Sequence, residues 1–144
     1  MRKFQAILIS IIFICSISYP QNIVGKIYTN AEANSLFGPI INLVPISSIQ
    51  LTNLTLKTTN YLMFRVLNGN LTILGDKRIV LYPVNSTISP KDVFRLLSIS
   101  LIQKLIKDGN SPMTNIEERN NGILTITNGV YTLDYSVICP PFCW

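Results

Sequence analysis

The chain contains no histidine among its 144 residues. This absence removes the commonest general base of enzymes, the histidine that activates serine and cysteine nucleophiles, and the commonest protein ligand of zinc. Glycine is sparse and never clustered, so there is no glycine-rich loop of the kind that cradles phosphate groups. The usual sequence signatures of a hydrolase, a zinc enzyme or a nucleotide-binding enzyme are therefore missing.

Charge is also scarce. Only 13% of the residues are Asp, Glu, Lys or Arg, with 12 basic residues against 7 acidic ones. The basic residues are scattered, and beyond the first three positions only Lys77 and Arg78 are adjacent. Nucleic-acid binding needs basic residues gathered on one face or along one helix, so no nucleic-acid partner is predicted. The abundance of Ile, Leu, Asn and Thr favours a β-rich folded domain over disorder.

The first 18 residues have the features of a cleaved export signal. Arg2 and Lys3 form a positive start, residues 6–14 are an apolar run, and small residues precede a cleavage point after Ser18. The run offers about a dozen apolar residues, whereas a membrane span needs about 20, so the mature chain is expected to have no span. The sequence predicts export to the periplasm, the cell surface or the medium. A lipid anchor on Cys15 is the alternative, although lipoprotein signals have a small residue where an apolar one precedes this cysteine.

Removing the signal leaves an even pair of cysteines, Cys139 and Cys143, in a tail over residues 139–144. In an exported chain such a pair favours a disulfide. An extended Pro-Pro segment would hold the two Cα atoms about 12 Å apart, whereas a disulfide needs them within about 7 Å. The chain must therefore turn between them, for which a cis proline is one route. The alternatives are a redox-active thiol pair, a metal site with further ligands, or a disulfide to another chain.

Early in the mature chain the sequence predicts one short helix followed by strands. Thr29 and Glu32 have the spacing of a capping box for a helix over residues 31–37, which Gly38-Pro39 would end. Residues 40–57 are apolar and rich in Thr, with few helix signals. They predict one or two strands with a bulge or turn partway along.

Asn68-Gly69 predicts a tight hairpin between strands at residues 62–67 and 70–74, because both positions of a two-residue loop need positive φ. With Leu67 opposite Asn70, Phe64 faces Ile73 and one face of the hairpin is wholly apolar. A one-residue slip would send these apolar side chains to opposite faces, so the register is well determined.

Asn128-Gly129 predicts a second hairpin, between residues 123–127 and 130–137. With Thr127 opposite Val130, one face is apolar. The other face is polar and comprises Thr125, Thr127, Thr132, Asp134 and Ser136. This alternation predicts an antiparallel sheet whose polar face is in water.

A long helix is predicted over residues 90–108, after a turn at 75–77 and a strand at 78–82 whose core-facing side is undetermined. Ser89 and Asp92 have capping-box spacing, and Gly109 would end the helix. Val93, Phe94, Leu97, Leu101 and Leu105 form an apolar stripe at helical spacing. A second stripe, formed by Ile99, Ile102 and Ile106, either widens the buried face or meets a partner subunit in a homodimer.

The acidic residues are the remaining candidates for catalysis. Asp92 and Asp76 are expected to serve as a cap and a turn residue. Glu117, Glu118 and Asp134 are left as a possible carboxylate pair for glycoside cleavage, which needs two acids facing each other across a cleft. Solvated acids at the start of a strand are far commoner than such a pair, so no catalytic residue is predicted.

Together these features predict one α+β domain over residues 19–138. A mostly antiparallel sheet of about six to eight strands would pack against the long helix, and no segment repeats at a fixed period. We expect an exported, non-enzymatic binding or structural module, with an unidentified protein or surface partner and no cofactor or metal. The alternatives are a small secreted hydrolase that uses the acidic residues, and a thiol or metal protein centred on Cys139 and Cys143.

Overall fold

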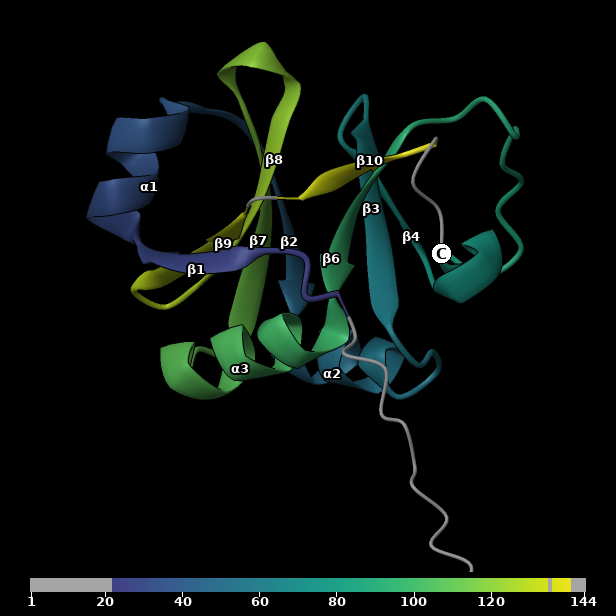
Figure 1. The fold of residues 1–144 in the computed structure, drawn as a ribbon, viewed down its shortest axis with the longest axis horizontal. Coiled ribbons are helices and arrows are strands. Elements are labelled where there is room, and N and C mark those ends of the chain that lie inside the picture. Colours follow the sequence, from purple (N-terminus) through teal and green to yellow (C-terminus); the bar gives the residue numbers. More distant parts are fainter. Residues whose placement is uncertain (1–21, 135, 141–144) are drawn as a thin grey trace, which may run out of the picture.

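A computed structural model of the chain describes residues 22–134 and 136–140 (Figure 1). This part of the chain forms two antiparallel five-stranded sheets and three α-helices, so the predicted α+β class is confirmed. The predicted export signal and Cys143 lie outside the described residues. Within the described ranges, no helix is long and apolar enough to cross a membrane.

The two sheets are called sheet A and sheet B. Sheet A consists, from edge to edge, of β1 (Lys26–Thr29), β9 (Tyr131–Asp134), β8 (Ile123–Asn128), β7 (Met113–Arg119) and β2 (Ile40–Ser47). Sheet B consists of β10 (Val137–Cys139), β6 (Phe94–Ser98), β3 (Tyr61–Leu67), β4 (Asn70–Leu74) and β5 (Val80–Tyr82). The helices are α1 (Asn30–Phe37), α2 (Ser48–Thr55) and α3 (Ile99–Gly109), and single 3₁₀ turns lie at Asp76–Arg78 and Asn120–Gly122.

The main core lies between the two sheets, and α2 and α3 close one end of it (Figure 1). Its completely buried members come from both sheets and from both helices: Phe64, Ile73, Leu97, Ile116, Ile126, Leu133, Leu51, Ile102 and Leu105. Full burial of such a side chain contributes roughly 1.5–3 kcal/mol. A smaller core covers the other face of sheet B, and α1 lies on the outer side of sheet A (Figure 1).

The chain is built from two halves that exchange their first strands. The first half is β2-α2-β3-β4-β5 and the second is β6-α3-β7-β8-β9, so each half runs from a strand directly into a helix and then into a hairpin. The leading strand of each half pairs in the other half's sheet, because β2 pairs with β7 and β6 pairs with β3. The strand orders β9-β8-β7-β2 and β5-β4-β3-β6 are therefore equivalent.

Matching hydrogen bonds support this internal symmetry. The N–H of Ser48, at the start of α2, donates to Pro112 O at 2.9 Å, just before β7. The N–H of Ile99, at the start of α3, donates to Asn60 O at 3.0 Å, just before β3. Each helix thus begins where its leading strand meets the hairpin of the other half.

Two local predictions are confirmed by the structure. Thr29 and Glu32 form both hydrogen bonds of the capping box, and α1 ends at Phe37 before Gly38. In the first hairpin Leu67 pairs with Asn70 and Phe64 with Ile73, as the apolar pattern requires. Each depends on residues close in sequence, so neighbouring residues suffice to specify the local conformation.

The prediction of strands throughout residues 40–57 is wrong in its second part, where the chain forms α2. Ser48, Leu51 and Leu54 are buried at helical spacing. The apolar residues that suggested alternation, Ile49 and Leu56, are 74% and 73% exposed. The helical period was present, and exposed apolar side chains masked it.

The predicted helix over residues 90–108 is also wrong in its first part, where the chain forms β6 and only then α3. Ser89 and Asp92 do form their turn, with the Ser89 N–H donating to the Asp92 carboxylate at 2.8 Å, but no helix follows it. Phe94 and Leu97, expected on one stripe, contribute to different cores on opposite faces of β6. A central strand buried on both faces is apolar at nearly every position, so periodicity cannot distinguish it from a buried helix.

The second predicted hairpin forms with a different register and a different environment. Asn128 pairs with Tyr131 and Thr127 with Thr132, so Gly129-Val130 forms the turn in place of Asn128-Gly129. Most of the face expected in water is buried, because Thr125, Thr127, Thr132 and Asp134 are at most 8% exposed, and of the predicted set Ser136 is partly exposed. The Thr132 hydroxyl donates to Asn30 Oδ1 at 2.9 Å, because α1 covers part of this face.

The second apolar stripe of the long helix lies mostly inside the chain. Ile99 and Ile102 are 7% and 0% exposed and belong to the main core, and Ile106 packs against it at partial exposure. These side chains are used by the chain's own packing, so the stripe gives no support to a homodimer, which stays a prediction.

Candidate functional site

The three acids that were considered for catalysis do not share one cleft. Glu117 and Glu118 are neighbours on β7 and therefore project to opposite faces of sheet A. Glu117 is buried, whereas Glu118 is partly exposed and accepts a hydrogen bond from Asn42 Nδ2 at 2.9 Å. Asp134 is buried at the end of β9, where it accepts from the N–H of Ser136 at 3.3 Å.

Glu117 belongs to a buried polar cluster that ties α1 to sheet A. Its Oε2 accepts from Arg119 Nη2 at 2.9 Å and from the Thr125 hydroxyl at 2.8 Å. Arg119 also donates to Asn34 Oδ1 at 2.8 Å and to Gly38 O at 2.7 Å, which lie in α1 and at its end. Because the buried Arg119 guanidinium holds the Glu117 carboxylate, we assign this carboxylate a structural role.

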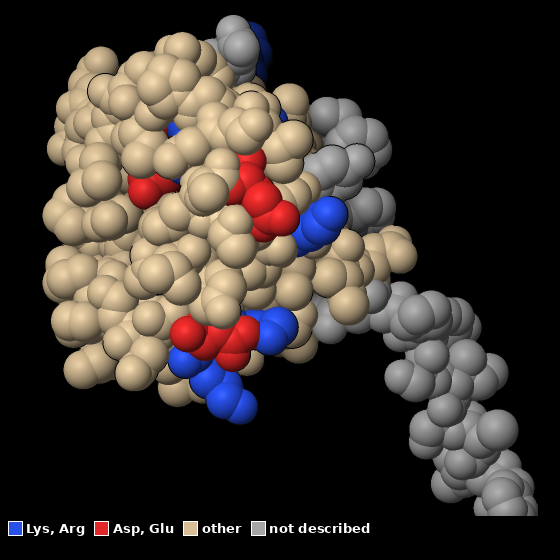
Figure 2. All heavy atoms as spheres, turned by 90° about the vertical axis from the view of Figure 1, so that its left-hand side faces the viewer, with Lys and Arg blue, Asp and Glu red and all other residues tan. Residues whose placement is uncertain are grey.

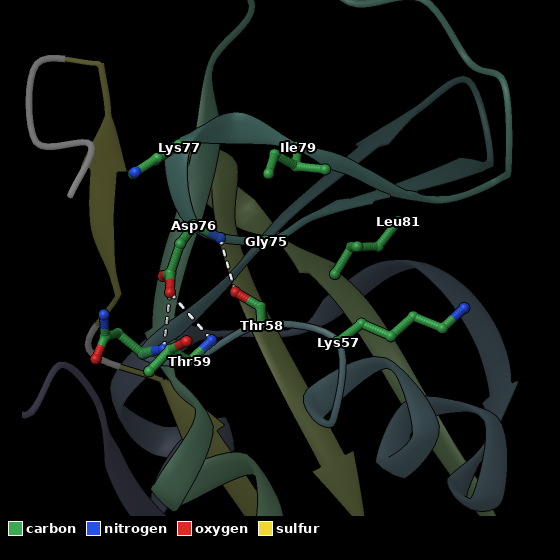
Figure 3. Close-up of a pocket in the computed structure, with 9 residues that line it drawn as sticks. Lys57, Thr58, Thr59, Gly75, Asp76, Lys77, Ile79 and Leu81 are labelled. Atoms are coloured by element: carbon green, nitrogen blue, oxygen red, sulfur yellow. Dashed lines mark hydrogen bonds between the residues drawn. The ribbon is translucent and has the colours of Figure 1, made fainter.

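A cavity in the described part of the chain lies between two loops, and we call it the Asp76 pocket (Figure 3). One wall is the loop between α2 and β3, and the other is the segment from the end of β4 into β5. The volume is about 400 Å³. The lining residues are Lys57, Thr58, Thr59, Asn60, Gly75, Asp76, Lys77, Ile79 and Leu81.

The Asp76 carboxylate fastens the two walls together. Its oxygens accept three backbone N–H bonds, from Thr59 at 3.1 Å, Asn60 at 2.9 Å and Tyr61 at 3.0 Å. The Asp76 N–H in turn donates to the Thr58 hydroxyl at 2.8 Å (Figure 3). The pocket is therefore preformed, because a charged acceptor and its donors fix both loops.

Tyr61, which follows this loop, is buried in the smaller core of sheet B. Burial raises the pKa of the Tyr61 hydroxyl above its usual range, and the negative charge of Asp76 adds to that rise. The hydroxyl donates to Asn22 O at 2.9 Å and so also fixes the segment that precedes β1.

The turn that carries Lys77 is held in a costly conformation. Lys77 and Arg78 have φ angles of 56° and 60°, which L-residues other than Asn and Asp seldom adopt. Arg78 is held in place by its guanidinium, which donates to Asp92 O at 2.9 Å and to Cys139 Sγ at 3.4 Å. Residues held in sparsely populated regions persist where their surroundings impose them, and they concentrate at functional sites.

The mouth of the pocket combines apolar surface with positive charge. Ile79 is 61% exposed and Leu81 is partly exposed. Lys57 and Lys77 are exposed, and their side chains extend to opposite sides of the opening (Figure 3). The two ammonium groups therefore flank the apolar surface.

The second half of the chain contains the counterpart of this place, and there it is closed. Asn128, at the end of β8, takes the position of Asp76, and its Oδ1 accepts the Ser111 N–H at 3.0 Å as Asp76 accepts that of Thr59. Asn128 is completely buried, and Gly109 packs against it so closely that an added Cβ would lie 2.3 Å from the Asn128 carbonyl oxygen. The same framework thus forms an open pocket in one half and a sealed contact in the other.

The outer part of β2 is a second exposed apolar surface. Ile41 and Leu43 are 64% and 44% exposed on this edge strand, and the side of the molecule that carries α1 has few charges (Figure 2). The edge is poorly suited to strand addition, because the Leu43 N–H donates to Asn42 Oδ1 at 2.9 Å and Pro45 has no N–H. It is a surface of exposed side chains on an edge strand, whereas the Asp76 pocket is a cavity between two loops.

The predicted cysteine tail is described only in part. Cys139 ends β10, is completely buried and precedes a cis bond to Pro140. Because Cys143 lies outside the described residues, the Cys139–Cys143 disulfide stays a prediction. Over residues 22–134 and 136–140, no group of three or more His, Cys, Asp and Glu side chains is placed to hold a metal ion.

Sequence reasoning found part of the Asp76 pocket. It predicted the turn at residues 75–77 and the role of Asp76 as a turn residue, which the hydrogen bonds confirm. It missed the partner loop at residues 57–60, because the predicted strand region ran to Lys57 and residues 58–61 received no assignment. No family model, curated protein or solved structure matches this chain.

Replacing Asp76 with Ala should destabilise the fold and loosen the pocket. The change leaves three backbone donors without their charged acceptor, and we expect a loss of about 2 kcal/mol in the free energy of unfolding. Urea denaturation measures the loss, and hydrogen exchange at Thr59, Asn60 and Tyr61 should accelerate. Asp108→Ala is the matched control, since the ion pair that Asp108 forms among the described residues is with exposed Lys104 within α3, and the change should alter stability by less than about 0.5 kcal/mol. Equal losses in the two variants would contradict the fastening role.

Proposed function

We propose that this chain is an exported, non-enzymatic binding module that takes a segment of a protein partner into the Asp76 pocket. The observation that carries the proposal is the contrast between the two halves. Asp76 and Asn128 accept equivalent backbone hydrogen bonds and so hold equivalent loops. At this place the first half has an open cavity with exposed apolar side chains at its mouth, whereas the second half has a sealed contact. A preformed concave surface with a few placed polar groups is typical of a binding site.

Two further observations favour binding over catalysis. The pocket contains a single carboxylate, Asp76, and its oxygens are occupied by backbone N–H groups. The acids of sheet A are separated or paired, with Glu117 bonded to Arg119 and Glu118 on the other face. Glu117→Gln, Glu118→Gln and Asp134→Asn are therefore not expected to affect partner binding unless they unfold the chain.

Export is proposed from the first 18 residues. Their positive start, apolar run and small residues before a cleavage point after Ser18 are those of a signal peptide. Export would also place Cys139 and Cys143 in an environment that allows a disulfide. The intact mass of the protein from an extracytoplasmic fraction should begin at Tyr19. A mass that begins at a lipid-modified Cys15 would instead show that the protein is anchored to a membrane.

Site-specific photocrosslinking tests the binding site. The full chain is produced in its own host with benzoylphenylalanine in place of Ile79, and separately in place of Val130. The two positions are 61% and 65% exposed and lie in corresponding regions of the two halves, so they are matched in exposure. A protein adduct should form at Ile79, should be weak at Val130, and should decrease when Asp76→Ala is added. Equal adducts at both positions, or none at Ile79, would overturn the proposal.

A further inference from the structure

We infer that the segment taken by the Asp76 pocket is an extended acidic one, with an apolar side chain between two carboxylates. The inference rests on the proposed function and adds the chemistry of the partner. It follows from the charges that flank the pocket, from the apolar surface between them, and from the direction in which the two lysines extend.

The positive charge at the mouth is available to a partner. Neither Lys57 nor Lys77 forms an ion pair with any of the described residues. The one acid of the pocket, Asp76, turns its oxygens toward the backbone of residues 59–61, which donates three hydrogen bonds to it. Those bonds offset part of its charge, so the two ammonium groups dominate the rim.

The surface between the lysines is suited to an aliphatic side chain. Ile79 and Leu81 line this wall, Ile79 is 61% exposed, and Gly75 lies beside them without a side chain. The volume of about 400 Å³ leaves room for one large apolar side chain and the backbone on either side of it.

The direction of the lysines favours an extended segment. Lys57 and Lys77 extend to opposite sides of the opening (Figure 3), so two separated carboxylates suit them better than one compact anion. In an extended chain, residues two positions apart face the same way. In a five-residue segment with acids at positions 1 and 5 and an apolar residue at position 3, these three side chains face the same way. The apolar side chain would enter the pocket, and the two carboxylates would meet the flanking ammonium groups.

Three synthetic peptides test this pattern on the protein recovered from its host. They are acetylated and amidated forms of Glu-Ser-Leu-Ser-Glu, of the same peptide with Lys for both Glu residues, and of the same peptide with Ser for Leu. Binding is followed by fluorescence anisotropy, and the surface contacted is mapped by NMR shifts of residues 57–60 and 75–81. The acidic leucine peptide should bind the most tightly, and its affinity should fall as salt is raised.

Charge reversal of the protein sharpens the test. Each of Lys57→Glu and Lys77→Glu should weaken the binding of the acidic peptide by about two- to five-fold, the range of an exposed ion pair. The double variant should bind the lysine peptide more tightly than the acidic one. Lys91→Glu and Lys107→Glu are the matched control, since both residues are exposed and lie outside the pocket lining. They should leave the preference for the acidic peptide in place.

The outcomes separate this inference from the function on which it rests. Leucine peptides that bind in the pocket equally well with either charge would overturn the acidic pattern and leave the binding function standing. An adduct at Ile79 from the host, together with no peptide-induced shifts in the pocket, would also overturn the pattern alone. Absence of both the adduct and the shifts would overturn the binding function itself.

Discussion

Replacing Arg119 with Met should lower the free energy of unfolding by about 3–5 kcal/mol. Arg119 is 1% exposed and joins Glu117, Thr125, Asn34 and Gly38 through hydrogen bonds of 2.7–2.9 Å. Without the guanidinium, the Glu117 carboxylate stays buried with no positive partner, and α1 loses one of its links to sheet A while the Thr132–Asn30 hydrogen bond remains. Chemical denaturation would measure the loss, and hydrogen exchange would show α1 opening before the sheets.

A double variant distinguishes loss of the pair from loss of packing. Glu117→Leu combined with Arg119→Met removes both charges and should recover a substantial part of the stability lost in the single variant, because the main cost is the unpaired buried charge. Arg95→Met is the control for removing an arginine, since Arg95 is partly exposed and its guanidinium donates to Gly122 O at 2.8 Å. A double variant as unstable as Arg119→Met alone would show that the unpaired Glu117 charge is not the cause.

Replacing Asn128 with Asp should cost about 3 kcal/mol or more at neutral pH. The Asn128 side chain is completely buried, and its Nδ2 donates toward Ser111 O at 3.2 Å, Met113 O at 3.1 Å and the Ser48 hydroxyl at 2.9 Å. A carboxylate would set an oxygen against those carbonyls. Burial would raise the pKa of the new carboxyl in the folded state, so the loss should be small below pH about 4, near the unfolded pKa, and grow as the pH rises.

The reciprocal change at the Asp76 pocket provides the comparison. Asp76→Asn keeps one oxygen acceptor for the backbone N–H groups of Thr59, Asn60 and Tyr61, and we expect a loss of about 1–2 kcal/mol. It introduces no buried charge, so its loss should change less between pH 4 and pH 7 than the loss in Asn128→Asp. Urea denaturation of both variants at pH 4 and pH 7 measures the difference. A larger loss for Asp76→Asn than for Asn128→Asp would contradict the roles assigned to the two side chains.

Features determined by neighbouring residues could be predicted from the sequence. The capping box of Thr29 and Glu32 and the register of the Asn68-Gly69 hairpin depend on short-range hydrogen bonds and on alternation along two adjacent strands. The second hairpin shows the limit of the same reasoning. The Asn128 side chain is needed for contacts with the loop after α3, so the turn moved one residue along the chain.

Features that depend on distant partners could not be predicted. The face of Thr125 and Thr132 looked like a surface, because nothing local shows that α1 and the Glu117–Arg119 pair cover it. The two halves are related by structure without an evident sequence repeat. Their buried positions correspond, as Leu51 and Leu54 do to Ile102 and Leu105, but the exposed residues between them differ.

The candidate site divides in the same way. The turn containing Asp76 is marked by Gly75, and so it was predicted. The second wall of the pocket follows α2, and finding it requires knowing that residues 48–55 form a helix that returns the chain to this turn. The opposite orientation of Glu117 and Glu118 was within reach of the sequence, because adjacent residues of one strand point to opposite faces.

The exchange of leading strands sets the order in which the chain can acquire its structure. During synthesis β2 is made long before its partner β7. The free edge of β3 likewise stays unpaired until β6 is made, and β6 follows the loop after β5. Closing such distant pairs is slow compared with forming a local hairpin. The first half is consequently left with unpaired strands until most of the polypeptide exists. That delay is compatible with the proposed export, in which the polypeptide is translocated across a membrane unfolded and folds afterwards.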